Sequence, residues 1–426
     1  MAPSERTPLA SGQPEEHRNS ALPLHRPSSY PAATGGHSES HSASSPTLLS
    51  SFRWLIFSSW LNILLVFVPL GFLAEKLHWG AATIFTLNFL AIVPLAKLLG
   101  DATEQASLKL GQTLGGLLNA TFGNAVELIV GIVALTQGQL RIVQTSLIGS
   151  ILSNILLVLG MSFVAGGIYK DENLFQTTAA QASGSIMTLG TVAVALPAAY
   201  QSSITMHTLL ANAGQGEPKG PNTDPEQGLL FISRGTSIIL LVIYAIYLVF
   251  QLKTHAYLFE ADQNNEDEEE ETPNMTPIAA VIGLGLVTVV TSFNADYLVG
   301  AIDEVAQEYK IPKAFIGTIL LPIVGNAAEH VTSVWMAAKD RLDLSLAVAL
   351  GSSIQIAIGL IPTLVLVGWA IDQPLTLYFQ TFETVVLIAS VVLVNSLIQD
   401  GRSNYIEGVM LCALYAVAAI SFWVEP

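Results

Sequence analysis

Two short stretches decide the fold of this chain: GNAVE at residues 123–127 and GNAAE at residues 325–329. They lie 202 positions apart, the distance from Gly123 to Gly325, and the alignment between them needs no gaps. At the same offset Gly149-Ser150 aligns with Gly351-Ser352. Apolar stretches align by chance, but a repeated Gly-Asn-Ala-x-Glu in apolar surroundings does not. The chain is therefore predicted to consist of two related halves.

The composition predicts that these halves lie in a membrane. The 426 residues are 51% hydrophobic and only 12% charged, with a mean hydropathy of +0.54. Soluble globular chains carry about 25% charged residues. A chain with so few charges cannot cover a water-soluble particle, so a lipid bilayer is its expected surrounding. The formal net charge of −16 argues against a nucleic-acid partner, because such a partner requires basic patches.

Apolar segments along the chain are long enough to cross a bilayer, which takes roughly 20 residues. They are 52–74, 80–100, 108–136, 142–168, 177–199, 229–252, 276–301, 311–338, 343–370, 374–398 and 403–424. The sequence therefore predicts an all-α polytopic membrane protein with about 11 transmembrane helices. Its predicted parts are a disordered tail (1–50), an extra first helix (51–75), a five-helix repeat (80–252), an acidic linker (253–275) and a second five-helix repeat (276–426).

The number of spans between the two motifs predicts how the halves are related. The motifs fall in the third and eighth spans, so the direction of the chain across the membrane is reversed between them. The halves are then inverted repeats. This arrangement is typical of secondary transporters, whose sites lie near the bilayer midplane where the repeats meet.

The distribution of Lys and Arg over the loops favours a cytosolic N-terminus. With that orientation the acidic linker, which contains the run Glu266–Glu271, also lies in the cytosol. The first fifty residues are rich in Ser, Pro, His and Gly. They lack the apolar stretch of a signal peptide, and their composition is typical of a disordered segment.

Glu127 and Glu329 lie in the middle of apolar spans, where an ionisable residue is a functional-site hypothesis by default. The alternatives are a structural ion pair and a permanently protonated, packed side chain. No basic residue lies near the centre of any predicted span, which disfavours an ion pair, and two such residues related by symmetry disfavour simple packing. Gly and Pro before each glutamate predict unwound backbone, which is tolerated at membrane depth only in a cavity lining or inside protein.

The residues around the two glutamates supply oxygen atoms, as a hard cation requires. Ca²⁺ takes 6–8 oxygen ligands in flexible geometry, and the scarcity of Cys and His in the spans disfavours zinc and copper. A buried carboxylate binds either a proton or a cation, and this competition is what an antiporter needs. His330 is a candidate second proton acceptor, with a neutral packing role as the alternative. The candidate cation and proton ligands are Glu127, Glu329, Asn124, Asn326, Ser150, Ser352, Ser153, Gln355 and His330, with Asn154 and Ser353 as further oxygen sources.

The doubled motif, the Gly-Ser pairs and the acidic stretch resemble those of the calcium/proton exchangers of the cation/calcium exchanger superfamily, most closely the fungal vacuolar type. The resemblance covers residues 50–426. It implies that Glu127 and Glu329 bind the cation, with Asn124 and Asn326 beside them. It also implies export of cytosolic Ca²⁺ into an acidic organelle, the vacuole, in exchange for H⁺, with Mn²⁺ as a second substrate.

Other functions remain open from the sequence. Na⁺/Ca²⁺ exchangers of the same superfamily generally carry more acidic or hydroxyl residues in the motif helices, whereas Val126 and Ala328 precede the glutamates here. A cation channel would use the carboxylates as a selectivity ring, usually in an oligomer, whereas one chain here contains both halves of a site. Neither an enzyme nor a cofactor is expected, and there is no phosphate-binding GKS or GKT loop for ATP. The oligomeric state is left open.

Overall fold

The computed structural model describes residues 46–168, 170–212, 225–258 and 273–425. Within these ranges the chain is helical, apart from short connections and one small antiparallel sheet. In that sheet β1 (Asn173–Leu174) pairs with β2 (Arg402–Ser403). Most of the predicted tail (1–50) and of the predicted acidic linker (253–275) lies outside the described residues.

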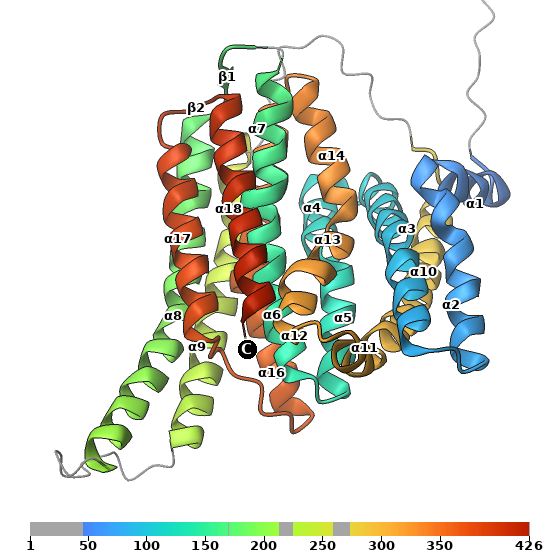
Figure 1. Ribbon diagram of the computed structural model, residues 1–426. Helices are drawn as coiled ribbons and strands as arrows, with labels where there is room; N and C mark the ends of the chain where they lie inside the picture. The colour runs from blue at the N-terminus through green and yellow to red at the C-terminus, as the bar shows by residue number, and fades with distance from the viewer. Residues whose placement is uncertain (1–45, 169, 213–224, 259–272, 426) are drawn as a thin grey trace, which may run out of the picture. The chain divides into compact units, whose positions relative to one another are not determined.

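The helices form three groups along the chain (Figure 1). The N-terminal group comprises α1 (Leu48–Phe57), η1 (Trp60–Val66) and α2 (Phe67–Lys76). The first half comprises α3 (Ala81–Ser107), α4 (Gly111–Phe122), α5 (Ala125–Thr136), α6 (Leu140–Leu152), η2 (Ser153–Val158), α7 (Leu159–Gly167), α8 (Thr177–Asn212), α9 (Pro225–Val249), η3 (Phe250–Thr254) and η4 (Ala256–Leu258). The second half comprises α10 (Pro277–Gly300), α11 (Ile302–Tyr309), α12 (Lys313–Phe315), η5 (Ile316–Leu320), α13 (Leu321–Gly325), α14 (Ala327–Ala338), α15 (Leu342–Ile354), η6 (Gln355–Leu360), α16 (Ile361–Ala370), α17 (Thr381–Leu397) and α18 (Tyr405–Val424).

The bounds of several helices repeat at the offset of the sequence motifs. In the first half α5, α6 and η2 begin and end 202 residues before α14, α15 and η6 of the second half. Both η2 and η6 are π-helical turns. Such turns interrupt α-helices frequently at functional sites, and here each follows one of the repeated Gly-Ser pairs.

The described helices include seven that are long and apolar enough to cross a membrane, or up to ten spans if each of three bent helix pairs is one span. The prediction of a polytopic all-α membrane protein is confirmed in this form. The helix α17, with 17 residues, is apolar but shorter than those seven.

The structure divides the segment 52–74, for which the sequence predicted one helix. Helix α1 ends at Phe57, and the chain turns by 92° before η1 begins at Trp60. The amide of Asn62 donates to the carbonyl oxygens of Leu55 (3.1 Å) and Ile56 (3.0 Å). These carbonyls lie in the last turn of α1, where helix continuation would otherwise satisfy them. A polar side chain therefore stabilises a bend that the apolar pattern does not reveal.

The connection between the predicted spans 177–199 and 229–252 is also shorter than the sequence predicted. Helix α8 continues to Asn212, and α9 begins at Pro225. Seven of the 13 residues from Gln201 to Ala213 are polar, and none of them is Gly or Pro. Polarity marks where a span is expected to leave the apolar layer, but it does not end a helix.

A buried ion pair fixes the start of α6 to the start of α17. Arg141 contacts both carboxylate oxygens of Glu383, at 2.6 and 2.9 Å. The Glu383 side chain is fully buried, and it also accepts a hydrogen bond from the backbone N–H of Gln380. Glu425, just after α18, lies 3.7 Å from the same guanidinium. Burial raises the pKa of Glu425, and the neighbouring Glu383 carboxylate raises it further.

Arg141→Ala is expected to lower the free energy of unfolding by about 3 kcal/mol, because it leaves a buried carboxylate without its partner. Arg402→Ala is the matched control, since its pair with Glu172 is exposed on both sides and should contribute about 0–1 kcal/mol. The measurement is thermal unfolding of the detergent-purified proteins. Equal melting temperatures for the two variants would contradict the assignment.

Candidate ion-binding site

Both motif helices are broken immediately before the glutamate. The helices on either side of residues 123–124 are bent by 45°, and those on either side of Asn326 by 58°. Asn124 (φ −103°, ψ 34°) and Asn326 (φ −89°, ψ 9°) leave the helical conformation. Glu127 and Glu329 then lie in the first turn of the following helix. The predicted break before each glutamate is confirmed.

The two asparagine side chains reach across the halves instead of capping their own helices. An Asn that precedes a helix usually accepts a hydrogen bond from the first-turn N–H groups, but neither side chain does so here. The Asn124 amide donates to Gln355 Oε1 at 2.6 Å. The Asn326 amide donates to the backbone carbonyl of Ser150 at 3.4 Å. Each motif is therefore tied to the π-turn helix of the other half.

Ser352 connects the two motifs. Its hydroxyl lies 2.5 Å from Glu329 Oε1 and 3.2 Å from Asn124 Oδ1. The side chains of Gln355, Asn124, Ser352 and Glu329 thus form one continuous polar chain.

Several polar atoms at this site are buried without a hydrogen-bond partner among the described residues. Among them are the amide oxygens Asn326 Oδ1 and Asn154 Oδ1. The Asn154 side chain lies close enough to Glu329 to interact with its carboxylate. Buried polar atoms are rarely left unpaired. Oxygen atoms of a carboxylate and of neutral amides suit a hard cation such as Ca²⁺.

Glu127 follows the break at residues 123–124 and lines a small cavity. The cavity has a volume of about 20 Å³ and is otherwise mostly apolar, with Ser146, Ser150 and Gly325 in its wall. That volume admits about one water-sized particle. A Cβ atom at Gly325 would lie only 2.9 Å from Glu127 Oε1. The glycine of the second motif thus leaves room for the carboxylate of the first, and the two carboxylates interact electrostatically.

His330 is held by its neighbours in one orientation. Its Nδ1 lies 2.7 Å from the Asn326 carbonyl oxygen, and its Nε2 lies 3.4 Å from Ser153 Oγ. A carbonyl oxygen only accepts, so Nδ1 carries a hydrogen and Nε2 of the neutral ring can accept from the Ser153 hydroxyl. Ser153 therefore contacts His330 at the start of η2, next to the buried Asn154.

Glu127 and Glu329 are the acidic side chains of this site in the part of the chain that the structure describes. No Lys, Arg or His forms an ion pair with Glu127 or Glu329 in the described parts of the chain. Within the same residues no group of three or more His, Cys, Asp or Glu side chains could hold a metal ion. A cation bound here would therefore take most of its ligands from neutral amide, hydroxyl and carbonyl oxygens.

A comparison with protein families identifies the group to which these features belong. The family model described as "Sodium/calcium exchanger protein" matches residues 80–253 and 279–424. The chain belongs to this family. The two matched ranges contain both motifs, both Gly-Ser pairs and every residue of the polar chain.

Individual exchangers of known name match most of the chain. The "Vacuolar calcium ion transporter" of Schizosaccharomyces pombe is 48% identical over 391 residues, which cover 92% of this chain and 91% of the relative. The "Ca(2+)/H(+) antiporter" of Synechocystis sp. is 42% identical over 385 residues, covering 85% and 97%.

Solved structures of exchangers are also similar to this chain. The "Structure of native YfkE" matches with a TM-score of 0.70 and 32% identity, covering 86% of this chain and 100% of that one. The "Crystal Structure of H+/Ca2+ Exchanger CAX" matches with a TM-score of 0.64 over 88% of this chain and 89% of that one. At 13% identity it shows a shared fold.

The exchanger structure separates the candidate oxygen sources that were expected together. Ser353 turns away, since its hydroxyl donates to the Ala349 carbonyl in its own helix (2.8 Å). Ser146, which lines the cavity beside Glu127, was not predicted. It lies four residues before Ser150, and residues at this spacing share a helix face. That spacing is the signal that could have identified it.

Proposed function

We propose that this exchanger is a Ca²⁺/H⁺ antiporter that moves Ca²⁺ from the cytosol into the acidic vacuole in exchange for protons. Glu127 and Glu329 bind the transported ions in turn, by alternating access. The observation that carries this proposal is the pair of glutamates at broken helices, joined across the halves by neutral oxygen ligands. Relatives named as a vacuolar calcium transporter and a Ca²⁺/H⁺ antiporter support the choice of ions.

The proposed architecture has eleven crossings, one before two inverted repeats of five. Adding α17 to the seven long helices and the three bent pairs accounts for this number. The repeat is supported by the helix bounds, because α5, α6 and η2 begin and end 202 residues before α14, α15 and η6. The two motif helices belong to the third and eighth crossings in this arrangement, and an odd-numbered and an even-numbered crossing run in opposite directions. We place the tail and the acidic linker in the cytosol.

The hydrogen bonds at Ser352 support proton binding at Glu329. A serine hydroxyl has one hydrogen to donate, yet Ser352 Oγ lies within bonding distance of both Glu329 and Asn124. If Glu329 is ionised, Ser352 donates to it and Asn124 Oδ1 receives nothing from Ser352. If Glu329 is protonated, it donates to Ser352, which donates to Asn124. The polar chain has a hydrogen bond at every step only when Glu329 carries a proton. A cation that binds Glu329 would displace that proton.

Other features distinguish this function from its alternatives. A Na⁺/Ca²⁺ exchanger is disfavoured by Val126 and Ala328 beside the glutamates, and a channel by the presence of both half-sites in one chain. Mn²⁺ also prefers carboxylate and carbonyl ligands, so the same site suits it as a second substrate.

The test is Ca²⁺ uptake into proteoliposomes of the purified protein, loaded at acidic pH and diluted into neutral buffer. We expect uptake that a protonophore abolishes and that needs neither ATP nor Na⁺. Uptake that follows a Na⁺ gradient and ignores the pH gradient would assign the protein to the sodium-coupled exchangers. Uptake that does not saturate and needs no counter-ion would indicate a channel.

Glu127→Gln and Glu329→Gln should each abolish exchange, because a neutral amide can neither release a proton nor supply charge to a divalent cation. Each variant should elute as the wild-type protein does in size-exclusion chromatography, since Gln has nearly the shape of Glu. Wild-type uptake rates in either variant would remove that glutamate from the proposed site.

Ser352→Ala should reduce uptake by about ten- to a hundredfold, the effect of losing a hydrogen bond to a charged group. Ser353→Ala is the matched control, because the neighbouring hydroxyl bonds only within its own helix, and its uptake should stay near wild type. The comparison is made over a range of internal pH values. Equal effects of the two substitutions would show that the polar chain has no part in transport.

A further inference from the structure

One crossing between the two halves is unusually close. Helix α6 of the first half packs against η5 and α13 of the second. A Cβ atom at Gly149 would overlap the backbone carbonyl of Thr318 and lie 2.6 Å from the ring of Pro322. A Cβ atom at Gly317 would likewise overlap the Thr145 side chain. Each half thus contributes a glycine that lets the two backbones approach, as small residues do at membrane helix crossings.

The counterpart of this crossing is open. At the offset of 202 residues α15 corresponds to α6, α4 corresponds to the segment of α12, η5 and α13, and Gly351 corresponds to Gly149. A Cβ atom at Gly351 would meet no atom within 4 Å. Gly149 is buried whereas Gly351 is partly exposed. Among the described residues α15 and α4 do not pack against each other as α6 and η5 do.

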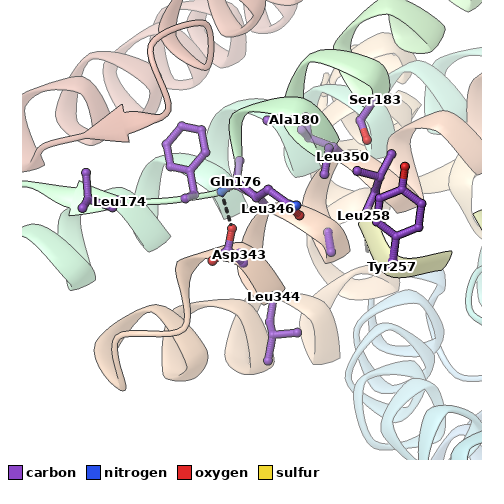
Figure 2. A pocket seen from close by; sticks show the side chains of 13 residues that line it. Leu174, Gln176, Ala180, Ser183, Tyr257, Leu258, Asp343, Leu344, Leu346 and Leu350 are labelled. Atoms are coloured by element: carbon purple, nitrogen blue, oxygen red, sulfur yellow. Dashed lines mark hydrogen bonds between the residues drawn. The ribbon is translucent and has the colours of Figure 1, made fainter. Parts of the chain in front are cut away.

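Helix α15 also borders an open cavity. A cavity of about 410 Å³ lies between the start of α8, the short helix η4 and the first half of α15, with Leu346 and Leu350 in its wall. Figure 2 shows these residues and the hydrogen bond of 2.7 Å from the Gln176 N–H to Asp343 that closes one side.

The corresponding face of α6 is fixed by stronger contacts. Gln144, the counterpart of Leu346, donates to the carbonyls of Thr376 (3.1 Å) and Tyr378 (2.9 Å). Arg141, the counterpart of Asp343, forms the buried pair with Glu383. The two related helices therefore differ in packing. Helix α6 is held by these contacts, whereas α15 borders a cavity into which it could shift.

We infer that Gly351 is a positioning residue for transport, which forms a close crossing with α4 when the crossing of α6 with η5 opens. This inference rests on the proposed function, in which two inverted halves exchange conformations across the site. In the exchanged state Gly351 takes the position that Gly149 has now. It then lies against the backbone of Gly116 and beside Ala120, the counterparts of Thr318 and Pro322. Ser352, the next residue, moves with it, so closure reaches the polar chain at Glu329.

The present state offers no reason for a glycine at position 351. Glycine is less favourable than alanine in a helix interior, and the space around Gly351 would accept a methyl group. A second conformation in which α15 crosses α4 closely would explain the glycine, because that crossing has no space for a Cβ atom. Gly149 has that reason already in this state.

The experiment compares Gly351→Ala with Gly285→Ala. Gly285 lies within α10, is exposed, and likewise has no atom within 4 Å of a Cβ position. Both variants should fold, and both should keep the Ca²⁺-dependent rise in melting temperature of the detergent-purified protein, because the site is intact in the present state. Proton-driven Ca²⁺ uptake should fall about tenfold or more in Gly351→Ala, as when a methyl group overpacks a close contact, and stay at the wild-type rate in Gly285→Ala.

Wild-type uptake by Gly351→Ala would overturn the inference, because the proposed crossing has no room for the methyl group. If Gly351→Ala loses both Ca²⁺ uptake and the Ca²⁺-dependent rise in melting temperature, the inference is also overturned, since the glycine would then act on the site itself. Absence of proton-driven uptake in the wild type and in both variants would instead contradict the proposed function, on which the inference rests. Loss of uptake with retained Ca²⁺ stabilisation, confined to Gly351→Ala, is the supporting result.

Discussion

The rest of the structure depends on the need to surround two carboxylates with polar partners inside an apolar helix bundle. An isolated ionised carboxylate is too costly to bury without partners. Glu329 has Ser352 of its own half as a partner. The asparagines before the two glutamates bond to the other half: Gln355 and Ser352 bond Asn124, and the Ser150 carbonyl bonds Asn326. Neither half completes its own site. The duplication is therefore a requirement of the chemistry, because each break in one motif helix is satisfied by the π-turn helix of the other half.

The sequence was sufficient for features that contrast with their surroundings. A glutamate, an asparagine or a Gly-Ser pair in an apolar span is conspicuous, so the repeated motif, the helix breaks before the glutamates and a set of candidate oxygen ligands could be named from the sequence. The family resemblance rested on the same residues, and the match to the exchanger family confirmed it. A polar side chain inside a membrane needs a polar partner or a ligand, so its position in the sequence is informative about the functional site.

Features decided by tertiary packing could not be predicted in this way. The bend after Phe57 depends on the Asn62 amide reaching the end of α1, and the length of α8 depends on helix-compatible residues beyond the apolar layer. The π turns are invisible in a pattern of apolar residues, because one extra residue per turn leaves the composition unchanged. The pairing of Arg141 with Glu383 joins residues 242 positions apart, and only the fold brings them together.

The halves are similar in sequence but differ in packing, and this difference is informative about energetics. At one end Gly149 and Gly317 hold α6 against η5, whereas Gly351 at the related position is free. A protein with two such crossings that share one site cannot close both and still admit an ion. The two closed forms must differ by only a few kcal/mol if both are to be populated in a transport cycle. Near-equal halves meet this condition without fine adjustment, because the residues of the proposed second crossing correspond to those of the first at the offset of 202.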